Sequence, residues 1–107
     1  MRIKLTTLKD CDRCNRLKQA LKENNLEYSF STCEEDPINC DNLEALLKVT
    51  TYPITLIVDT NDNILKILYL VNDYNELGKK YNLGGRVQGI PLHSIEQMLQ
   101  YVKNKLY

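Results

Sequence analysis

The chain has 107 residues, of which 43% are hydrophobic and 26% charged, the composition of one soluble globular domain. Fourteen Lys and Arg residues balance fourteen Asp and Glu residues, so no overall charge would attract nucleic acid or an anionic membrane surface. A domain of this size buries enough surface to fold without obligatory disulfides or metal. The four cysteines are therefore candidates for chemistry.

Two absences in the sequence bear on where the protein works. The longest apolar stretches, at residues 54–58 and 64–70, fall far short of the roughly 20 residues of a membrane-spanning helix. The first five residues enter a strand-like pattern and lack the apolar core and cleavage site of a secretory signal. We therefore expect a cytoplasmic protein, a setting in which cysteines serve redox chemistry or metal binding more often than structural disulfides.

The first elements in chain order form a strand, a helix and a strand. Alternating apolar residues predict a strand over residues 2–8. Apolar residues then recur every three or four positions, which predicts a helix from Asp12 to about Asn24. A short strand at residues 28–31 follows, so the sequence predicts a βαβ unit with a right-handed crossover.

The middle of the chain predicts a loop, a helix and a hairpin. Residues 32–42 are acidic and loop-like, and the leucines of residues 43–47 indicate a short second helix. Two apolar runs at residues 54–58 and 64–70 are joined by a polar turn at residues 59–63, which predicts a β-hairpin.

The last third of the chain predicts two helices. A capping-box pattern at Asp73 and the pair Gly84-Gly85 would delimit a short helix near residues 74–82. A second capping box at Ser94, followed by an apolar stripe of helical spacing, predicts the final helix.

The most informative motif is Cys11-x-x-Cys14, at the point where the first strand gives way to the helix. The unpaired N–H groups and the dipole of a helix N-terminus stabilise an anion, so Cys11 ionises more easily and is the predicted nucleophile. Cys14 follows about one helical turn later and is placed to resolve a mixed disulfide with Cys11. Residues 9–18, which include Arg13, carry four basic residues against two acidic ones, and this surplus also favours a thiolate.

The order of elements and a second motif, Thr51-Tyr52-Pro53 at the start of the hairpin, resemble the glutaredoxins and the wider thioredoxin superfamily. The resemblance implies an α/β thioredoxin-like fold of glutaredoxin type, with a mixed four-stranded sheet flanked by helices. Residues 1–107 would form a single domain. An insertion at about residues 72–91 would precede the last helix.

The resemblance also implies a function and a site. In these families the proline corresponding to Pro53 is cis and lies against the active cysteines, and the backbone before it pairs with the incoming substrate. Thr51, Tyr52, Pro53 and Arg13 are therefore expected to contact substrate, with the Tyr52 ring lining the groove. The expected protein is a small thiol–disulfide oxidoreductase that reduces protein or glutathione mixed disulfides without a tightly bound cofactor.

The expected partners follow from the same resemblance. They are disulfide-containing proteins and an electron donor, either glutathione or a reductase of the thioredoxin-reductase type, with no nucleic acid or membrane partner and a monomeric chain. The sequence departs from the family at two places. Asp12-Arg13 replaces the usual Pro-Tyr between the cysteines, and Val71-Asn72-Asp73 stands where glutaredoxins carry the glycine pair and acidic residue that hold glutathione.

Cys33 and Cys40 enclose an acidic loop with no basic residue, a setting that opposes thiolate formation. We expect two ordinary free thiols; a second disulfide, a relay, or a zinc site completed by Cys11 and Cys14 are the alternatives. An iron–sulfur cluster bridged between two subunits through Cys11 is a further alternative. The competing functional hypothesis is a non-catalytic binding module that keeps the thioredoxin fold and recognises a partner through the insertion.

Overall fold

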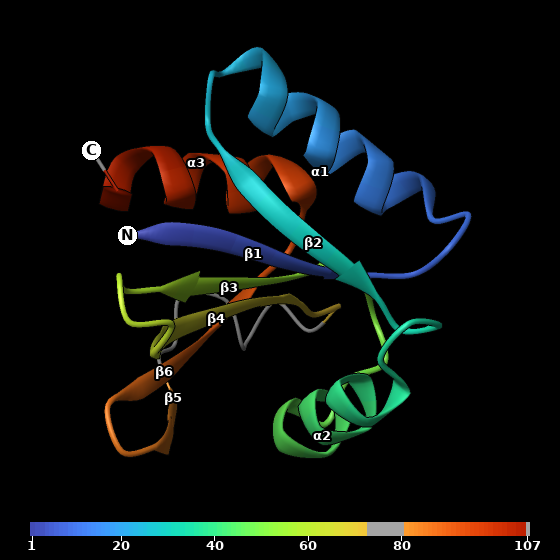
Figure 1. The fold of residues 1–107 in the computed structure, drawn as a ribbon, viewed down its shortest axis with the longest axis vertical. Coiled ribbons are helices and arrows are strands. Elements are labelled where there is room, and N and C mark those ends of the chain that lie inside the picture. Colours follow the sequence, from blue (N-terminus) through green and yellow to red (C-terminus); the bar gives the residue numbers. More distant parts are fainter. Residues whose placement is uncertain (73–80, 107) are drawn as a thin grey trace.

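A mixed β-sheet forms the centre of the computed structural model, which describes residues 1–72 and 81–106. In chain order the elements are β1 (Arg2–Thr7), α1 (Asp12–Glu23), β2 (Tyr28–Thr32), α2 (Pro37–Leu47), β3 (Ile54–Val58), β4 (Ile64–Leu70), β5 (Tyr81–Gly84), β6 (Val87–Leu92) and α3 (Ile95–Leu106). The six strands lie in the order β2-β1-β3-β4-β6-β5. Figure 1 shows α1 and α3 together on one side of the sheet and α2 on the other.

The pairing of the strands confirms the thioredoxin-like class and corrects the strand number. β1 is parallel to β2 and antiparallel to β3, and β3 is antiparallel to β4. These four strands are the predicted mixed sheet. β6 then adds to β4 in parallel and β5 closes the sheet as an antiparallel edge strand, so the sheet has six strands instead of four.

Strand alternation divides the core into two parts, because successive side chains of a strand point to opposite faces. In β3, Ile57 packs toward α1 and α3, whereas its neighbours Leu56 and Val58 pack toward α2. The core beneath α1 and α3 contains Ile3, Leu5, Leu17, Leu21, Leu26, Ile57, Leu68, Leu70, Ile90, Ile95, Met98 and Val102. The core beneath α2 contains Cys14, Cys40, Leu43, Leu47, Tyr52, Ile54, Leu56, Val58, Ile67 and Tyr69.

The last helix forms as its capping pattern predicts. The backbone N–H of Gln97 donates to the Ser94 hydroxyl at 3.2 Å, and the Gln97 side chain accepts from the N–H of His93 at 2.6 Å. These reciprocal bonds satisfy N–H groups that have no partner within a helix. Met98, on the apolar stripe of α3, is fully buried and accepts the hydroxyl of Thr55 at 3.7 Å.

The second helix is longer than predicted. α2 begins at Pro37, inside the stretch where the sequence predicts a loop, and the carboxylate of Asp36 caps it by accepting the N–H of Asn39 at 3.2 Å. An Asp at the cap followed by a Pro at the first helical position is a standard start signal, and here it outweighs the lack of apolar periodicity. The helix ends at Leu47, and its C-cap Lys48 is left-handed with φ 58°.

The predicted helix near residues 74–82 is wrong where it can be compared. Its part at residues 74–80 lies outside the described residues, and Tyr81–Gly84 is the strand β5. Gly84 (φ 126°) and Gly85 (φ 55°) do not end a helix; they form the turn between β5 and β6. The sequence does not predict β6, because Gly89 and Pro91 interrupt the apolar alternation of residues 87–92. Glycine and proline are both rare inside strands.

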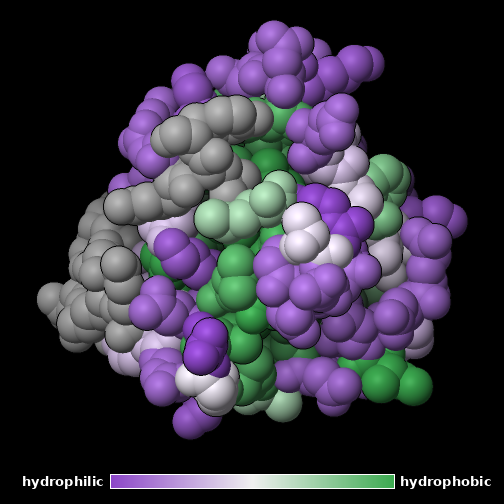
Figure 2. Space-filling model, turned by 60° about the vertical axis from the view of Figure 1, so that its left-hand side comes forward, coloured by the Kyte–Doolittle hydropathy of each residue, from purple (hydrophilic) through white to green (hydrophobic). Residues whose placement is uncertain are grey.

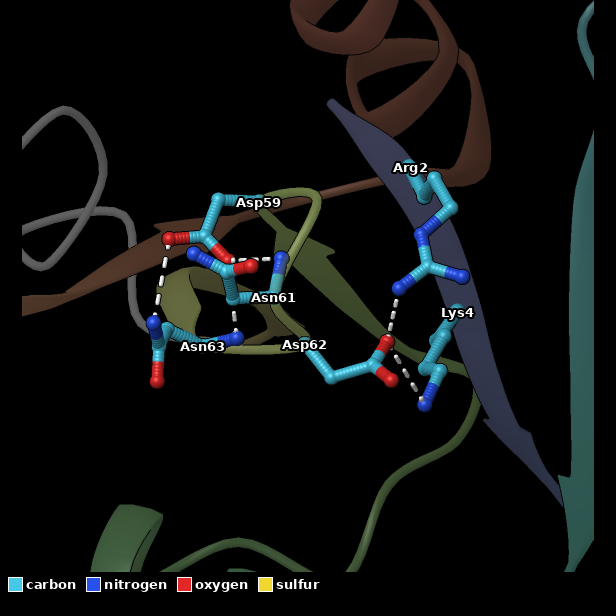
Figure 3. Close-up of polar contacts among 6 residues, drawn as sticks. All are labelled: Arg2, Lys4, Asp59, Asn61, Asp62 and Asn63. Atoms are coloured by element: carbon cyan, nitrogen blue, oxygen red, sulfur yellow. Dashed lines mark hydrogen bonds and ion pairs between the residues drawn. The ribbon is translucent and has the colours of Figure 1, made fainter.

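A network of polar contacts stabilises the predicted turn between β3 and β4 (Figure 3). The Asp59 carboxylate accepts the backbone N–H of Asn63 at 3.0 Å, and this bond helps to hold the pKa of Asp59 below its ordinary value. Asp62, at the left-handed position of the turn, forms ion pairs with Arg2 and with Lys4 of β1. The turn is therefore attached to the neighbouring strand β1.

The outer surface agrees with the composition. Hydrophilic residues cover most of the face shown in Figure 2, and hydrophobic surface is visible between them. No helix in the described part of the chain is both long enough and apolar enough to cross a membrane.

Candidate active site

The pair Cys11 and Cys14 lies at the junction of β1 and α1, as the sequence predicts. Cys11 is the N-cap of α1, with an extended backbone, and its sulfur accepts the backbone N–H of Cys14 at 3.2 Å. A thiolate at this atom would therefore sit at the positive end of the helix and accept one of its unpaired N–H groups.

The two sulfurs differ in access. Cys11 is partly exposed, whereas Cys14 is 0% exposed. They are joined as a disulfide, with their Cα atoms 5.2 Å apart, so each sulfur reaches the other without any rearrangement of α1. This arrangement suits a reaction in which an outside partner meets Cys11 and the buried Cys14 releases it.

The second sequence motif lies at the same end of the sheet. Because β1 and β3 are antiparallel, with Thr6 opposite Ile54, the segment after β1 and the residues before β3 are neighbours. The Tyr52–Pro53 peptide bond is cis, as the family resemblance implies. The hydroxyl of Thr51 donates to the carbonyl of Leu70 at 2.8 Å and fixes this segment against the end of β4.

Packing connects the two motifs. Cys14 and Tyr52 belong to the same cluster of buried residues under α2, and Cys11 packs against that cluster. The structure thus brings together the Cys pair and the proline motif, which are separated by some forty residues of sequence. Arg13, the remaining predicted contact, is exposed on the first turn of α1.

The side chain of Tyr52 has a different place from the predicted one. It is 2% exposed, and its hydroxyl donates to the Glu44 carboxylate of α2 at 2.7 Å. Burial, together with this bond to a negatively charged partner, raises the pKa of Tyr52 above its ordinary value. The ring is therefore part of the core and does not line an open groove. Glu44 belongs to no sequence motif, so the sequence does not reveal its contact with Tyr52.

Two of the four basic residues around the Cys pair have partners of their own. The guanidinium of Arg16 pairs with Glu96 of α3 at 2.7 Å, and the ammonium of Lys18 lies 3.6 Å from the centre of the Phe30 ring. The surplus of positive charge counted along the sequence is thus partly directed away from the cysteines. Stabilisation of a Cys11 thiolate depends mainly on the end of α1.

Cys33 and Cys40 are joined by a disulfide, with Cα atoms 5.6 Å apart, so the expectation of two free thiols is wrong. Cys33 follows β2 and Cys40 lies in α2, whose early start at Pro37 brings the two close together. Within residues 1–72 and 81–106, no group of three or more His, Cys, Asp or Glu side chains is arranged to hold a metal ion. A zinc site made by the four cysteines has no support here.

Comparison with protein families shows the family to which the chain belongs. The glutaredoxin family model matches residues 3–60, more than half of the chain. The chain belongs to the glutaredoxin family. A solved structure of NrdH-redoxin from Escherichia coli, described as a glutaredoxin-like protein with a thioredoxin-like activity profile, matches with a TM-score of 0.51 and 24% identity. That match covers 55% of this chain and 76% of the other and shows the fold alone. The comparison with curated proteins found no match.

This glutaredoxin departs from the family at the expected glycine pair. The contact of Thr51 with Leu70 places the carboxyl end of β4 beside the proline motif. β6 runs parallel to β4, so Gly84-Gly85, just before Val87, lie at the opposite end of the sheet from the cysteines. Gly84-Gly85 are therefore not in a position to replace the glycine pair with which, by the family resemblance, glutaredoxins hold glutathione.

Proposed function

We propose that this glutaredoxin is a thiol–disulfide oxidoreductase that uses Cys11 and Cys14 as its redox-active pair. The observation that carries the proposal is the capping geometry, in which the partly exposed Cys11 sulfur accepts an N–H of α1 while Cys14 is buried one turn away. A helix terminus that stabilises a thiolate makes an attacking sulfur at neutral pH.

The reaction has two exchange steps. The Cys11 thiolate attacks one sulfur of a substrate disulfide, so that a Cys11–substrate bond forms and the substrate's other sulfur leaves as a thiolate and takes up a proton. Cys14, after losing its proton, then attacks the Cys11 sulfur. The Cys11–Cys14 bond forms, the second substrate thiol is released, and two electrons have passed to the substrate.

The segment Thr51–Pro53 would hold the substrate during these steps. The side chains of Thr51 and Tyr52 are engaged with Leu70 and Glu44, so contact with a substrate would fall to the backbone of the segment, in which Thr51 is the partly exposed residue and Tyr52 and Pro53 are buried. We propose that a substrate chain pairs with this backbone in the manner of an added strand. Arg13, which is exposed and lies between the two cysteines in the sequence, would contact acidic groups of that chain.

We propose that the electron donor is a protein reductase of the thioredoxin-reductase type, with glutathione as the competing donor. Two observations support this choice. The only adjacent glycines of the chain, Gly84-Gly85, lie at the far end of the sheet, and the similar NrdH-redoxin is described as having a thioredoxin-like activity profile. The substrates would be disulfide-containing proteins, met by a monomer in a reducing cytoplasm, where the oxidised pair is continually reduced again.

Replacement of each cysteine tests the proposal. Cys11→Ser should abolish reduction of a disulfide substrate, because no other thiolate occupies the end of α1. Cys14→Ser should instead accumulate a mixed disulfide through Cys11, which mass spectrometry detects. Equal turnover of Cys11→Ser and the wild type would refute the assignment.

The donor is tested in the same assay. Disulfide reduction is measured with NADPH and thioredoxin reductase, and in parallel with NADPH, glutathione reductase and glutathione. The proposal expects faster turnover with thioredoxin reductase. Faster turnover with glutathione would overturn the choice of donor and leave the roles of Cys11 and Cys14 intact.

A further inference from the structure

The disulfide between Cys33 and Cys40 has no part in the proposed reaction, yet it repeats the design of the first pair. Cys33 is partly exposed at the end of β2, and Cys40 is 3% exposed within α2. Each pair therefore has one partly exposed cysteine and one buried cysteine.

The two pairs occupy adjacent loops. The backbone N–H of Cys33 donates to the carbonyl of Thr7, the last residue of β1, at 2.8 Å. The carboxylate of Glu34, the next residue, accepts the N–H of Lys9 with both oxygens at 3.2 Å, and Lys9 lies two residues before Cys11. The loop that carries Cys33 is thus bonded to the loop that leads to Cys11.

The buried sulfurs share one environment. Cys14 and Cys40 both belong to the apolar cluster under α2, and Cys11 and Cys33 both pack against it. Packing of this cluster joins α1, α2 and the start of β3 around the two disulfides. A shift of the Cys33 loop toward Cys11 would therefore take place along a surface that both cysteines already contact.

The surroundings of the two pairs stabilise different redox states. The Cys11 sulfur accepts an N–H of α1, which favours its reduced, thiolate form. The Cys33 sulfur has no hydrogen bond among the described residues, and Glu34, Glu35 and Asp36 follow it directly. A pair whose thiolate is stabilised is the stronger oxidant, and this contrast makes Cys33 and Cys40 the pair that we expect to be more strongly reducing.

We infer that Cys33 and Cys40 form a second redox-active pair, which stores two electrons and passes them to the Cys11–Cys14 disulfide of the same chain. The inference rests on the proposed function, because the stored electrons leave the protein only through Cys11. A fully reduced chain would then reduce two substrate disulfides before it needs its donor.

The transfer uses the same exchange chemistry. The Cys33 thiolate attacks the Cys11 sulfur, so that a Cys33–Cys11 bond forms, the Cys11–Cys14 bond breaks, and Cys14 leaves and takes up a proton. Cys40 loses its proton and attacks the Cys33 sulfur. The Cys33–Cys40 bond forms and Cys11 leaves as a thiolate at the end of α1, where it is stabilised. Two electrons pass from one pair to the other and no outside reagent is consumed.

A count of electrons tests the inference. Each protein is fully reduced with dithiothreitol, freed of reductant without oxygen, and mixed with an excess of a peptide dimer joined by one disulfide. Two peptide disulfides should be reduced per wild-type chain, the second in a slower phase. The Cys33→Ala/Cys40→Ala variant should reduce one, and the Cys11→Ser/Cys14→Ser variant none in the time that the first variant needs.

The outcomes separate the two proposals. One disulfide reduced by both the wild type and the Cys33→Ala/Cys40→Ala variant overturns the electron store and leaves the proposed function intact. No reduction by either protein refutes the proposed function. Reduction by Cys11→Ser/Cys14→Ser, or a second phase whose rate rises with chain concentration, overturns transfer within one chain.

A measurement on the unaltered protein tests the order of the two pairs. The oxidised wild type is treated with one equivalent of dithiothreitol and left to reach equilibrium, the thiols are alkylated, and the peptides are mapped by mass spectrometry. Alkylated Cys11 and Cys14 beside an intact Cys33–Cys40 disulfide are expected. The opposite distribution would overturn the inference.

Discussion

The hydroxyl of Tyr52 donates a hydrogen bond to the carboxylate of Glu44 at 2.7 Å, and this bond ties α2 to the residue before the cis proline. Glu44 lies one helical turn after Cys40, so the same helix carries half of the second disulfide and holds the segment proposed to contact substrate. Both ends of this contact are shielded, since Tyr52 is 2% exposed and Glu44 is partly buried.

Loss of this bond should lower stability. Tyr52→Phe keeps the buried ring and removes the donor, leaving a partly buried carboxylate without its partner. We expect the free energy of unfolding to fall by about 1.5–3 kcal/mol, the range for a hydrogen bond to a charged group. Urea denaturation at pH 7 measures the change.

Tyr101→Phe is the matched control. The hydroxyl of Tyr101 is buried and has no hydrogen-bond partner among the described residues. Its removal should leave stability unchanged or raise it by up to about 1 kcal/mol, because an unpaired buried polar group is itself unfavourable. If the two variants lost equal stability, the Tyr52–Glu44 bond would have no special role.

Alkaline pH should remove the stability that the Tyr52–Glu44 hydrogen bond contributes to the wild type. The pKa of Tyr52 is raised in the folded protein by burial and by Glu44, whereas in the unfolded chain it is about 10. The contribution is therefore fully present below pH about 10 and is lost as the pH rises toward the folded pKa, since only the unfolded chain gives up the proton there. The stability difference between wild type and Tyr52→Phe should accordingly shrink above pH 10 and stay constant between pH 6 and 9. A difference that is constant up to pH 11 would contradict this account.

The second disulfide should contribute to stability as well as to electron storage. It closes a loop of eight residues, for which the chain-entropy relation gives about 2–3 kcal/mol. Cys33→Ala/Cys40→Ala should lose this amount relative to the oxidised wild type. The reduced wild type is the control and should match the variant; if it is as stable as the oxidised form, the disulfide does not constrain the unfolded chain.

The turn at Gly85 should require glycine for a conformational reason alone. Its φ is 55°, and a Cβ added there would meet no atom within 4 Å. Gly85→Ala should therefore cost about 1 kcal/mol, the penalty of the left-handed region for a residue with a side chain. Gly85→Asn should cost less, because Asn tolerates this region, and equal losses for both variants in thermal denaturation would point to a steric cause instead.

Much of the fold could be predicted because local signals and tertiary packing agree. The apolar runs of β3 and β4, the cap of α3 and the spacing between Cys14 and Pro53 each point to the structure that forms. The place of the Cys pair at a helix start also follows from the sequence, because it depends only on where one strand ends and a helix begins.

Other features depend on contacts that no local pattern records. β6 is stabilised by pairing with β4, which outweighs the breaks at Gly89 and Pro91. The bond between Cys33 and Cys40 depends on the start of α2 at Pro37, and the burial of Tyr52 depends on Glu44 in another element. In each case a partner distant in sequence, or an element boundary set by a cap, decided the outcome.

The contrast between the two exposed sulfurs can be measured by alkylation. In the fully reduced protein, iodoacetamide should modify Cys11 before Cys33, because an N–H of α1 stabilises the Cys11 thiolate whereas acidic residues follow Cys33. The buried Cys14 and Cys40 should react last. Time-resolved peptide mapping gives the order, and Cys11→Ser should remove the fast event while leaving the rate at Cys33 unchanged. Faster modification of Cys33 would mean that the acidic loop, and not the start of α1, carries the more reactive sulfur, and both the proposed nucleophile and the direction of electron transfer would then be reversed.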